Sequence, residues 1–223
     1  MNAIAASADV RTPHREALRI DGEKIYRDAV IDVRNPYDGA RVGTVPKATL
    51  DDVRRAFAVA RAYRPTLTRH ERAAILRRAA DIVRARTAEI AALITAEAGL
   101  CIKDSTYEAG RVADVLTFGA GEVLKDDGQI FSCDLTPHGK KRRVYTQRDP
   151  LLGVISAITP FNHPMNQVSH KLAPAIATNN RLVLKPTELT PLTALALADV
   201  LYEAGLPPEM LSVVTGNPST MGD

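Results

Sequence analysis

The chain has 223 residues, of which 45% are hydrophobic and 25% are charged, a composition typical of a globular protein with a sizeable core. Its 29 basic and 26 acidic residues give a net charge of +3, so charge alone indicates neither nucleic acid nor an anionic membrane as a partner. No apolar run approaches the roughly 20 residues of a membrane span, and Cys101 and Cys133 lack the spacing of a metal site. We therefore expect a cytoplasmic protein that binds no metal, membrane or nucleic acid.

The first part of the chain is polar at its start and rich in β-forming residues further on. We expect a mobile leader over residues 1–17, because this stretch lacks the long apolar core of a signal peptide. Strands and helices are expected over 18–126. Within residues 18–48, two β-rich runs flank the turn signal NPYDG at 35–39, which predicts a pair of strands.

Four helices are expected next, and the sequence contains signals for several of their ends. Thr49 is a plausible N-cap, because acidic residues follow it in the first turn. Thr68 and Glu71 have the spacing of a capping box, and Gly99 is a natural helix terminator. The fourth helix, expected over 103–124, is weakened by its glycines.

Residues 127–150 are expected to form a β-hairpin. The runs GQIFSCDL and RRVYTQRDP alternate in the manner of strands and flank the turn-forming TPHGKK. The basic run Lys140–Arg143 falls at the end of this hairpin and has no interleaved aromatic residues, so we expect a solvated hairpin end and no nucleic-acid site.

From residue 151 to residue 223, strand and helix signals alternate. The apolar runs LLGVISAI, RLVLK and LSVVTG are typical of buried parallel strands, and amphipathic segments separate them. This order predicts a βαβαβ unit, which is half of a doubly wound nucleotide-binding sheet. The expected fold class is therefore α/β: an incomplete doubly wound parallel sheet with three strands and an open edge, preceded by helices and a β-hairpin.

Unusual residues follow each of these three strands. The first is followed by TPFNHP, the second ends in KPTE and the third in TG, and ligands bind at the carboxyl ends of strands in such sheets. Pro160 stops the first strand and Pro164 begins the next helix, so the loop between them is stiff. It can hold the amide of Asn162 toward a developing oxyanion. The alternative is that Asn162 caps the following helix.

The end of the second strand has groups that suit a ribose. Lys185 donates hydrogen bonds and Glu188 accepts them, which matches a pair of sugar hydroxyls. A carboxylate there repels a 2′-phosphate, so we expect NAD as the cofactor and consider NADP less favoured. The alternative is a local ion pair. No G-x-G-x-x-G follows any of the strands, so the phosphates must be held in another way.

These motifs resemble those of the aldehyde dehydrogenase superfamily. The segments ITPFNHP, KPTELTP and EAGLPPEM are similar to the family patterns I-T-P-W-N-F-P, K-P-S-E-x-T-P and E-A-G-L-P-P-G, and the resemblance covers about residues 20 to 223. It implies the N-terminal part of that fold, NAD-dependent oxidation of an aldehyde, and a homodimer or homotetramer assembled through the hairpin. It also implies an oxyanion-binding role for Asn162 and cofactor-binding roles for Ile158, Thr159, Pro160, Phe161, Lys185, Pro186, Thr187, Glu188 and Gly216.

Two departures from the family pattern bear on the substrate. Phe161 replaces the usual tryptophan, and His163 replaces the usual phenylalanine with a group that can bind an anion. The fourth helix lines the substrate entrance in the family, so Arg111 is expected to meet an anionic aldehyde there. The alternatives are a hydrogen-bonded His163 that touches no substrate and a surface pair between Arg111 and Asp114.

The amino-acid sequences of residues 99–111, 126–148 and 158–171 most resemble those of family members that oxidise phosphonoacetaldehyde to phosphonoacetate. The family's nucleophilic cysteine, which forms a thiohemiacetal with the aldehyde, and its general-base glutamate lie in the second half of a longer chain. Neither Cys101 nor Cys133 matches that nucleophile, so we expect this sequence to be an N-terminal part of the enzyme. The alternatives are oxidation of another acidic aldehyde, such as succinate semialdehyde, and an inactive NAD-binding module.

Overall fold

The computed structural model describes residues 14–125, 128–147 and 149–221. Most of the expected leader, residues 1–13, lies outside the described residues. The end of that segment is part of a sheet, because strand β1 (His14–Arg15) pairs in parallel with β5 (Arg41–Pro46). The prediction of a mobile segment is therefore wrong for residues 14–17.

The strand pair predicted around the turn at 35–39 is confirmed. Strand β4 (Val30–Arg34) pairs antiparallel with β5, with Ile31 opposite Val45. The Asn35 side chain accepts a hydrogen bond from the Tyr37 N–H at 2.8 Å, and Asp38 accepts one from the Ala40 N–H at 2.9 Å. These side-chain contacts are the local reason why Asn and Asp form this turn.

A second hairpin, which the sequence reasoning did not separate, lies just before this pair. Strands β2 (Leu18–Ile20) and β3 (Glu23–Ile25) are joined by Asp21 and Gly22, which have φ angles of +56° and +74°. Two such angles in a two-residue loop are those of a type I′ turn, for which Asp-Gly is a preferred sequence.

The four predicted helices are present as α1 (Leu50–Ala62), α2 (Arg69–Ala85), α3 (Thr87–Ala98) and α4 (Ile102–Val123). Both α1 and α2 begin with complete capping boxes, formed by Thr49 with Asp52 and by Thr68 with Glu71. Gly99 ends α3 in the left-handed conformation, and an added Cβ would lie 2.5 Å from Pro36. The local capping signals therefore gave the correct helix ends.

The predicted βαβαβ unit is confirmed, and with it the α/β fold class. It consists of strand β8 (Ile155–Ile158), helix α5 (Pro164–Ala177), strand β9 (Leu182–Lys185), helix α6 (Leu192–Glu203) and strand β10 (Leu211–Val213), followed by the short helix α7 (Pro218–Met221). The three strands are parallel and lie in the order β10-β9-β8.

The sheet has five strands where the sequence predicted three, and one of its edges is covered. Strand β2 pairs antiparallel with β10, so the hairpin β2–β3 extends the sheet to the order β3-β2-β10-β9-β8. In the described part of the chain, β8 pairs with β9 alone and forms the other edge.

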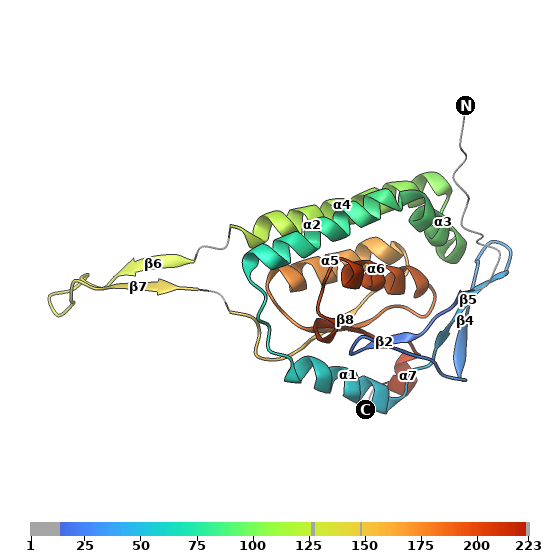
Figure 1. The fold of residues 1–223 in the computed structure, drawn as a ribbon, viewed down its shortest axis with the longest axis horizontal. Helices are drawn as coiled ribbons and strands as arrows, with labels where there is room; N and C mark the ends of the chain where they lie inside the picture. The colour runs from blue at the N-terminus through green and yellow to red at the C-terminus, as the bar shows by residue number, and fades with distance from the viewer. Residues whose placement is uncertain (1–13, 126–127, 148, 222–223) are drawn as a thin grey trace.

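Figure 1 shows the elements stacked in layers, with α2, α3 and α4 outermost, α5 and α6 beneath them, and then the sheet. Helix α1 covers the opposite face of the sheet together with α7. The main apolar core fills the space between the helical layers and the sheet and includes Leu76, Leu116, Leu172 and Leu195. A smaller cluster that includes Leu18, Ile20 and Ala56 joins the sheet to α1.

The predicted hairpin is also confirmed, as β6 (Gln129–Ser132) paired with β7 (Arg143–Thr146). It projects away from the rest of the molecule (Figure 1). Ile130 and Tyr145 face each other across the strands, and each is about three-quarters exposed, at 73% and 76%. The basic run Lys140–Arg143 is exposed, as expected for the solvated end of the hairpin.

Candidate functional site

The carboxyl ends of the three parallel strands meet at one edge of the sheet, as predicted. Ile158 of β8 lies opposite Lys185 of β9, and Leu184 lies opposite Val213 of β10. The pairing continues past the strand ends, because the Thr159 N–H donates to the Lys185 carbonyl at 3.3 Å. The segments that follow β8 and β9 therefore begin side by side.

The loop after β8 exposes most of its side chains. Ile158 and Phe161 are 68% and 55% exposed, and Pro160 and Asn162 are also exposed. Thr159 is buried, and within the described residues its hydroxyl has no hydrogen-bond partner. Helix α5 begins at Pro164, as the sequence predicted.

The alternative role of Asn162 as a helix cap is contradicted by the structure. The residue at the N-cap position of α5 is His163, and its side chain does not cap the helix. The first backbone N–H groups of α5, those of Met165 and Asn166, donate instead to the Glu108 carboxylate of α4 at 2.9 and 3.0 Å. Asn162 forms no side-chain hydrogen bond within the described residues, so its amide is available to a ligand.

The loop after β9 contains a close ion pair. Lys185 Nζ lies 2.8 Å from Glu188 Oε2, and the two side chains are 14% and 35% exposed. The hydrogen bond from Lys185 is the main cause that lowers the pKa of Glu188, so this carboxylate is ionised at neutral pH. The ion pair that we considered as an alternative is thus present, and it holds both groups at the strand end. Pro186 is buried, and Thr187 accepts from the Leu189 N–H at 3.4 Å.

Gly216, after β10, is buried against α7. A Cβ at this position would lie 2.4 Å from the sulfur of Met221. The absence of a side chain is therefore explained by packing inside the chain itself.

The two residues expected to meet an anionic substrate are held by α4. His163 Nδ1 lies 3.3 Å from Glu108 Oε2, and the ring is 45% exposed. The surface pair between Arg111 and Asp114, which was the alternative to a substrate role, does not form within the described residues. The Arg111 guanidinium lies over the Tyr107 ring instead, 5.9 Å from its centroid. Arg111 follows Glu108 by three residues, so both lie on neighbouring turns of one helix face.

Sequence reasoning missed two buried glutamates that cap helices from a distance. Glu108, 2% exposed, caps α5, and Glu97 of α3, also 2% exposed, caps α6. Glu97 accepts from the N–H groups of Leu192 and Thr193 at 2.8 and 2.9 Å, and from the Thr193 hydroxyl. Each of these helices follows one of the two candidate loops.

Burial, with a further contribution from the charge of Glu108, raises the pKa of Glu97 to about 7 from its usual 4.5. Between these two values the folded state keeps a proton that the unfolded state releases. Protonated Glu97 therefore adds to the free energy of unfolding in full below about pH 4.5. This contribution, on the order of 3 kcal/mol, is lost as the pH rises through 7. We expect denaturant unfolding from pH 4.5 to pH 8 to show this loss in the wild type but not in Glu97→Gln. A difference in unfolding free energy between the wild type and Glu97→Gln that stays constant with pH would contradict the raised pKa of Glu97.

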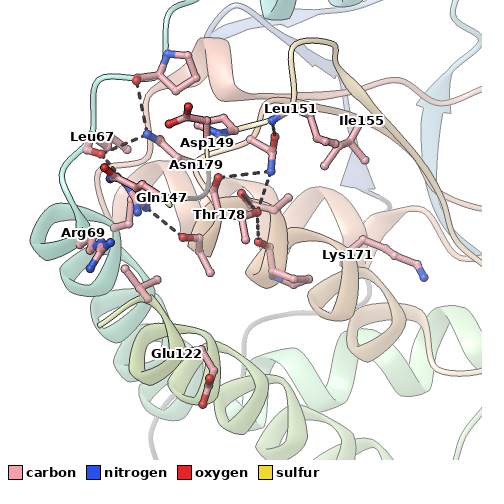
Figure 2. A pocket seen from close by; sticks show the side chains of 18 of the residues that line it. Leu67, Arg69, Glu122, Gln147, Asp149, Leu151, Ile155, Lys171, Thr178 and Asn179 are labelled. Atoms are coloured by element: carbon pink, nitrogen blue, oxygen red, sulfur yellow. Dashed lines mark hydrogen bonds between the residues drawn. The ribbon is translucent and has the colours of Figure 1, made fainter. Parts of the chain in front are cut away.

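A cavity of about 1610 Å³ lies along the edge strand β8, from Ile155 to Ile158. Figure 2 shows Leu67 and Asn179 on one side of it and Lys171 on the other, and the Asn179 amide donates to the Pro65 and Leu67 carbonyls. Ile158 is the one residue predicted for cofactor or substrate binding that also lines this cavity.

None of the helices in the described part of the chain combines the length and apolar character that a membrane span requires.

Comparison with known proteins gives a consistent result. Residues 24–223 match the aldehyde dehydrogenase family. A 3-sulfolactaldehyde dehydrogenase of Priestia aryabhattai is 38% identical over 207 residues, which are 92% of this chain and 43% of that protein. The structure of a succinate-semialdehyde dehydrogenase from Burkholderia pseudomallei matches with a TM-score of 0.88 at 34% identity, over 97% of this chain and 45% of that one.

A third match is an NADP-dependent glyceraldehyde-3-phosphate dehydrogenase from Bacillus halodurans C-125 complexed with NADP. Its TM-score is 0.89 at 30% identity, over 93% of this chain and 45% of that one. The chain thus spans less than half the length of the proteins that it matches.

Proposed function

The chain belongs to the aldehyde dehydrogenase family, and from this premise we propose that the whole protein oxidises an anionic aldehyde to its acid with NAD. The favoured substrate is phosphonoacetaldehyde, which would yield phosphonoacetate. One observation carries the proposal: the loop with Asn162 and the Lys185–Glu188 pair start from neighbouring strands at one edge of the sheet.

The residues at this edge fit the cofactor by their chemistry. The Lys185 ammonium can donate to a ribose hydroxyl, and the ionised Glu188 can accept from one. A negative charge there favours the free 2′-hydroxyl of NAD over the 2′-phosphate of NADP. Ile158, Thr159, Pro160 and Phe161 would line the nicotinamide side, with Pro186, Thr187 and Gly216 nearer the adenosine. NAD, when bound, supplies the hydride acceptor.

The substrate side of the proposal rests on Asn162, His163 and Arg111. The free amide of Asn162 can donate to an oxyanion as it develops on the aldehyde oxygen. The Arg111 guanidinium and an N–H group of the His163 ring can donate hydrogen bonds to a phosphonate, a sulfonate or a carboxylate. Two similar proteins are named as dehydrogenases of 3-sulfolactaldehyde and of succinate semialdehyde. Both of these aldehydes are anionic, which supports an anionic aldehyde as the substrate class.

Succinate semialdehyde is a second candidate substrate, favoured by the similarity to the Burkholderia pseudomallei enzyme. The two candidates differ in the geometry of their anionic group, because a phosphonate is tetrahedral and a carboxylate is planar. Comparing kcat/KM for both aldehydes separates them.

We expect Arg111→Ala to raise KM for phosphonoacetaldehyde by about tenfold while KM for propionaldehyde stays nearly constant, because only the first substrate offers a charge to the guanidinium. Arg84→Ala is the matched control, since Arg84 lies on α2 and is bonded to Asp81 and Thr117. Steady-state kinetics with both aldehydes measures the effect. Equal changes in KM for the two aldehydes would contradict a substrate role for Arg111.

We also propose that the β6–β7 hairpin joins subunits in a homodimer or homotetramer. The support is its exposed apolar pair, Ile130 and Tyr145, on a hairpin that projects from the molecule. The expected compartment is the cytoplasm.

A further inference from the structure

One carboxylate of α4 contacts both the backbone and a side chain of the candidate substrate loop. Glu108 Oε1 accepts from the N–H groups of Met165 and Asn166, and Glu108 Oε2 lies 3.3 Å from His163 Nδ1. Glu108 is 2% exposed, so these hydrogen bonds are shielded from water. A buried charged acceptor forms stronger hydrogen bonds than a neutral one.

The loop between β8 and α5 is thereby fixed at both ends. At its start, the Thr159 N–H is bonded to the Lys185 carbonyl of β9. At its end, the first turn of α5 has no cap from its own N-cap residue and depends on Glu108 for its free N–H groups. The start of α5, which follows His163 directly, therefore depends on a residue that lies more than 50 positions earlier in the chain.

The same carboxylate also sets the direction of the His163 ring. A carboxylate only accepts hydrogen bonds, so Nδ1 carries the hydrogen in this contact. The other ring nitrogen, Nε2, is left for a ligand and donates to an anion when the ring is an imidazolium. The ring is 45% exposed, so it remains accessible while it is held.

We propose that Glu108 is a positioning residue for aldehyde oxidation, which orients the His163 ring toward the anionic group of the substrate by holding that ring and the first turn of α5 together. The inference rests on the proposed function for its link to catalysis. Glu108 itself touches the start of α5 and His163, and it acts on the substrate only through them.

The kinetic test is a double-mutant cycle in the protein expressed from its complete native reading frame. Glu108→Gln keeps an oxygen acceptor but removes the charge, and His163→Asn removes the ring. We expect each to lower kcat/KM for phosphonoacetaldehyde about tenfold, with a much smaller loss for propionaldehyde. Because both act through the same ring, the double variant should lose little more than His163→Asn alone.

Glu97→Gln is the matched control at pH 8, because above its raised pKa of about 7 Glu97 is ionised and the variant makes the same chemical change at the cap of α6. It should leave the ratio of kcat/KM for the two aldehydes unchanged. Independent, multiplicative losses in the cycle, or equal losses for both aldehydes, would overturn the positioning role of Glu108. A normal ratio of the two kcat/KM values in His163→Asn would refute the substrate role of His163, and with it the proposed orientation of the ring.

Hydrogen exchange gives a readout that does not depend on turnover. In Glu108→Gln we expect the amides of Met165 and Asn166 to exchange roughly tenfold faster, because a neutral acceptor replaces a charged one. In Glu97→Gln, measured at pH 8 where Glu97 of the wild type is ionised, the faster exchange should fall at Leu192 and Thr193 instead. Unchanged exchange at the start of α5 would overturn the proposal even if the enzyme oxidises aldehydes. Absence of aldehyde oxidation in the wild type would refute the proposed function, separately from this result.

Discussion

Replacing Asn162 with alanine is expected to lower kcat for aldehyde oxidation roughly 100- to 1000-fold. The amide lies in the loop between β8 and α5, is exposed, and forms no hydrogen bond within the described residues. An amide N–H that is free in this way can be used to stabilise negative charge on the aldehyde oxygen, which is largest in the transition state. The loss should therefore appear in kcat more than in KM.

The same structural facts predict what Asn162→Ala leaves unchanged. The side chain is exposed and does not cap α5, so Tm should remain within a degree or two of the wild-type value. The dissociation constant for NAD should also be retained, because Lys185 and Glu188 are intact. A variant with wild-type kcat, or one whose lost activity is matched by a large fall in Tm, would contradict the oxyanion role.

Replacing Glu188 with glutamine is expected to shift the preference for NAD over NADP by on the order of 100-fold. The change removes the charged acceptor for a ribose hydroxyl, which weakens the binding of NAD. It also leaves Lys185 without its partner at 2.8 Å, so that the ammonium can pair with a 2′-phosphate. The ratio of kcat/KM for the two cofactors measures both effects.

Glu203→Gln is the matched control for this change. Glu203 forms an ion pair of the same length, 2.8 Å, with Arg86, but it lies at the far end of α6 from the Glu188 loop. The cofactor preference should be unaffected by this variant. If Glu188→Gln also left the preference unaltered, the Lys185–Glu188 pair would be a structural ion pair without a role in selecting the cofactor.

The features that sequence reasoning predicted correctly are set by short-range interactions. The N-cap at Thr49, the capping box at Thr68 and the helix end at Gly99 depend on residues three or four positions away. The βαβαβ unit could be predicted because its strands are continuous apolar runs and its helices have their own period. The convergence of the strand ends then follows from the parallel topology.

The features that it missed depend on contacts between distant segments. The pairing of β2 with β10 joins Arg19 to Val213, and β2 is only three residues long. The Asp21-Gly22 turn was a usable signal for the β2–β3 hairpin, but nothing local indicates which strand the hairpin joins. The contact between the Arg111 guanidinium and the Tyr107 ring could have been predicted from the sequence, because the two residues are four positions apart on one helix.

Glu97 and Glu108 had no local signal at all. In the sequence each is an acidic residue within a helix, which is ordinarily solvated. Their burial is explained by the N-termini of α5 and α6, whose N–H groups have no cap within their own segments. Only the packing of α3 and α4 against those helices brings the carboxylates to them.

The central claim is that this chain holds the cofactor and the anionic aldehyde in an NAD-dependent aldehyde dehydrogenase. Formation of NADH by the protein expressed from its complete reading frame, with phosphonoacetaldehyde, succinate semialdehyde and propionaldehyde in parallel, tests it most directly. The account predicts NADH formation with kcat/KM highest for an anionic aldehyde, and a lower kcat/KM with NADP. No NADH with any aldehyde, together with measurable binding of NAD, would contradict the claim and leave the inactive cofactor-binding module as the explanation.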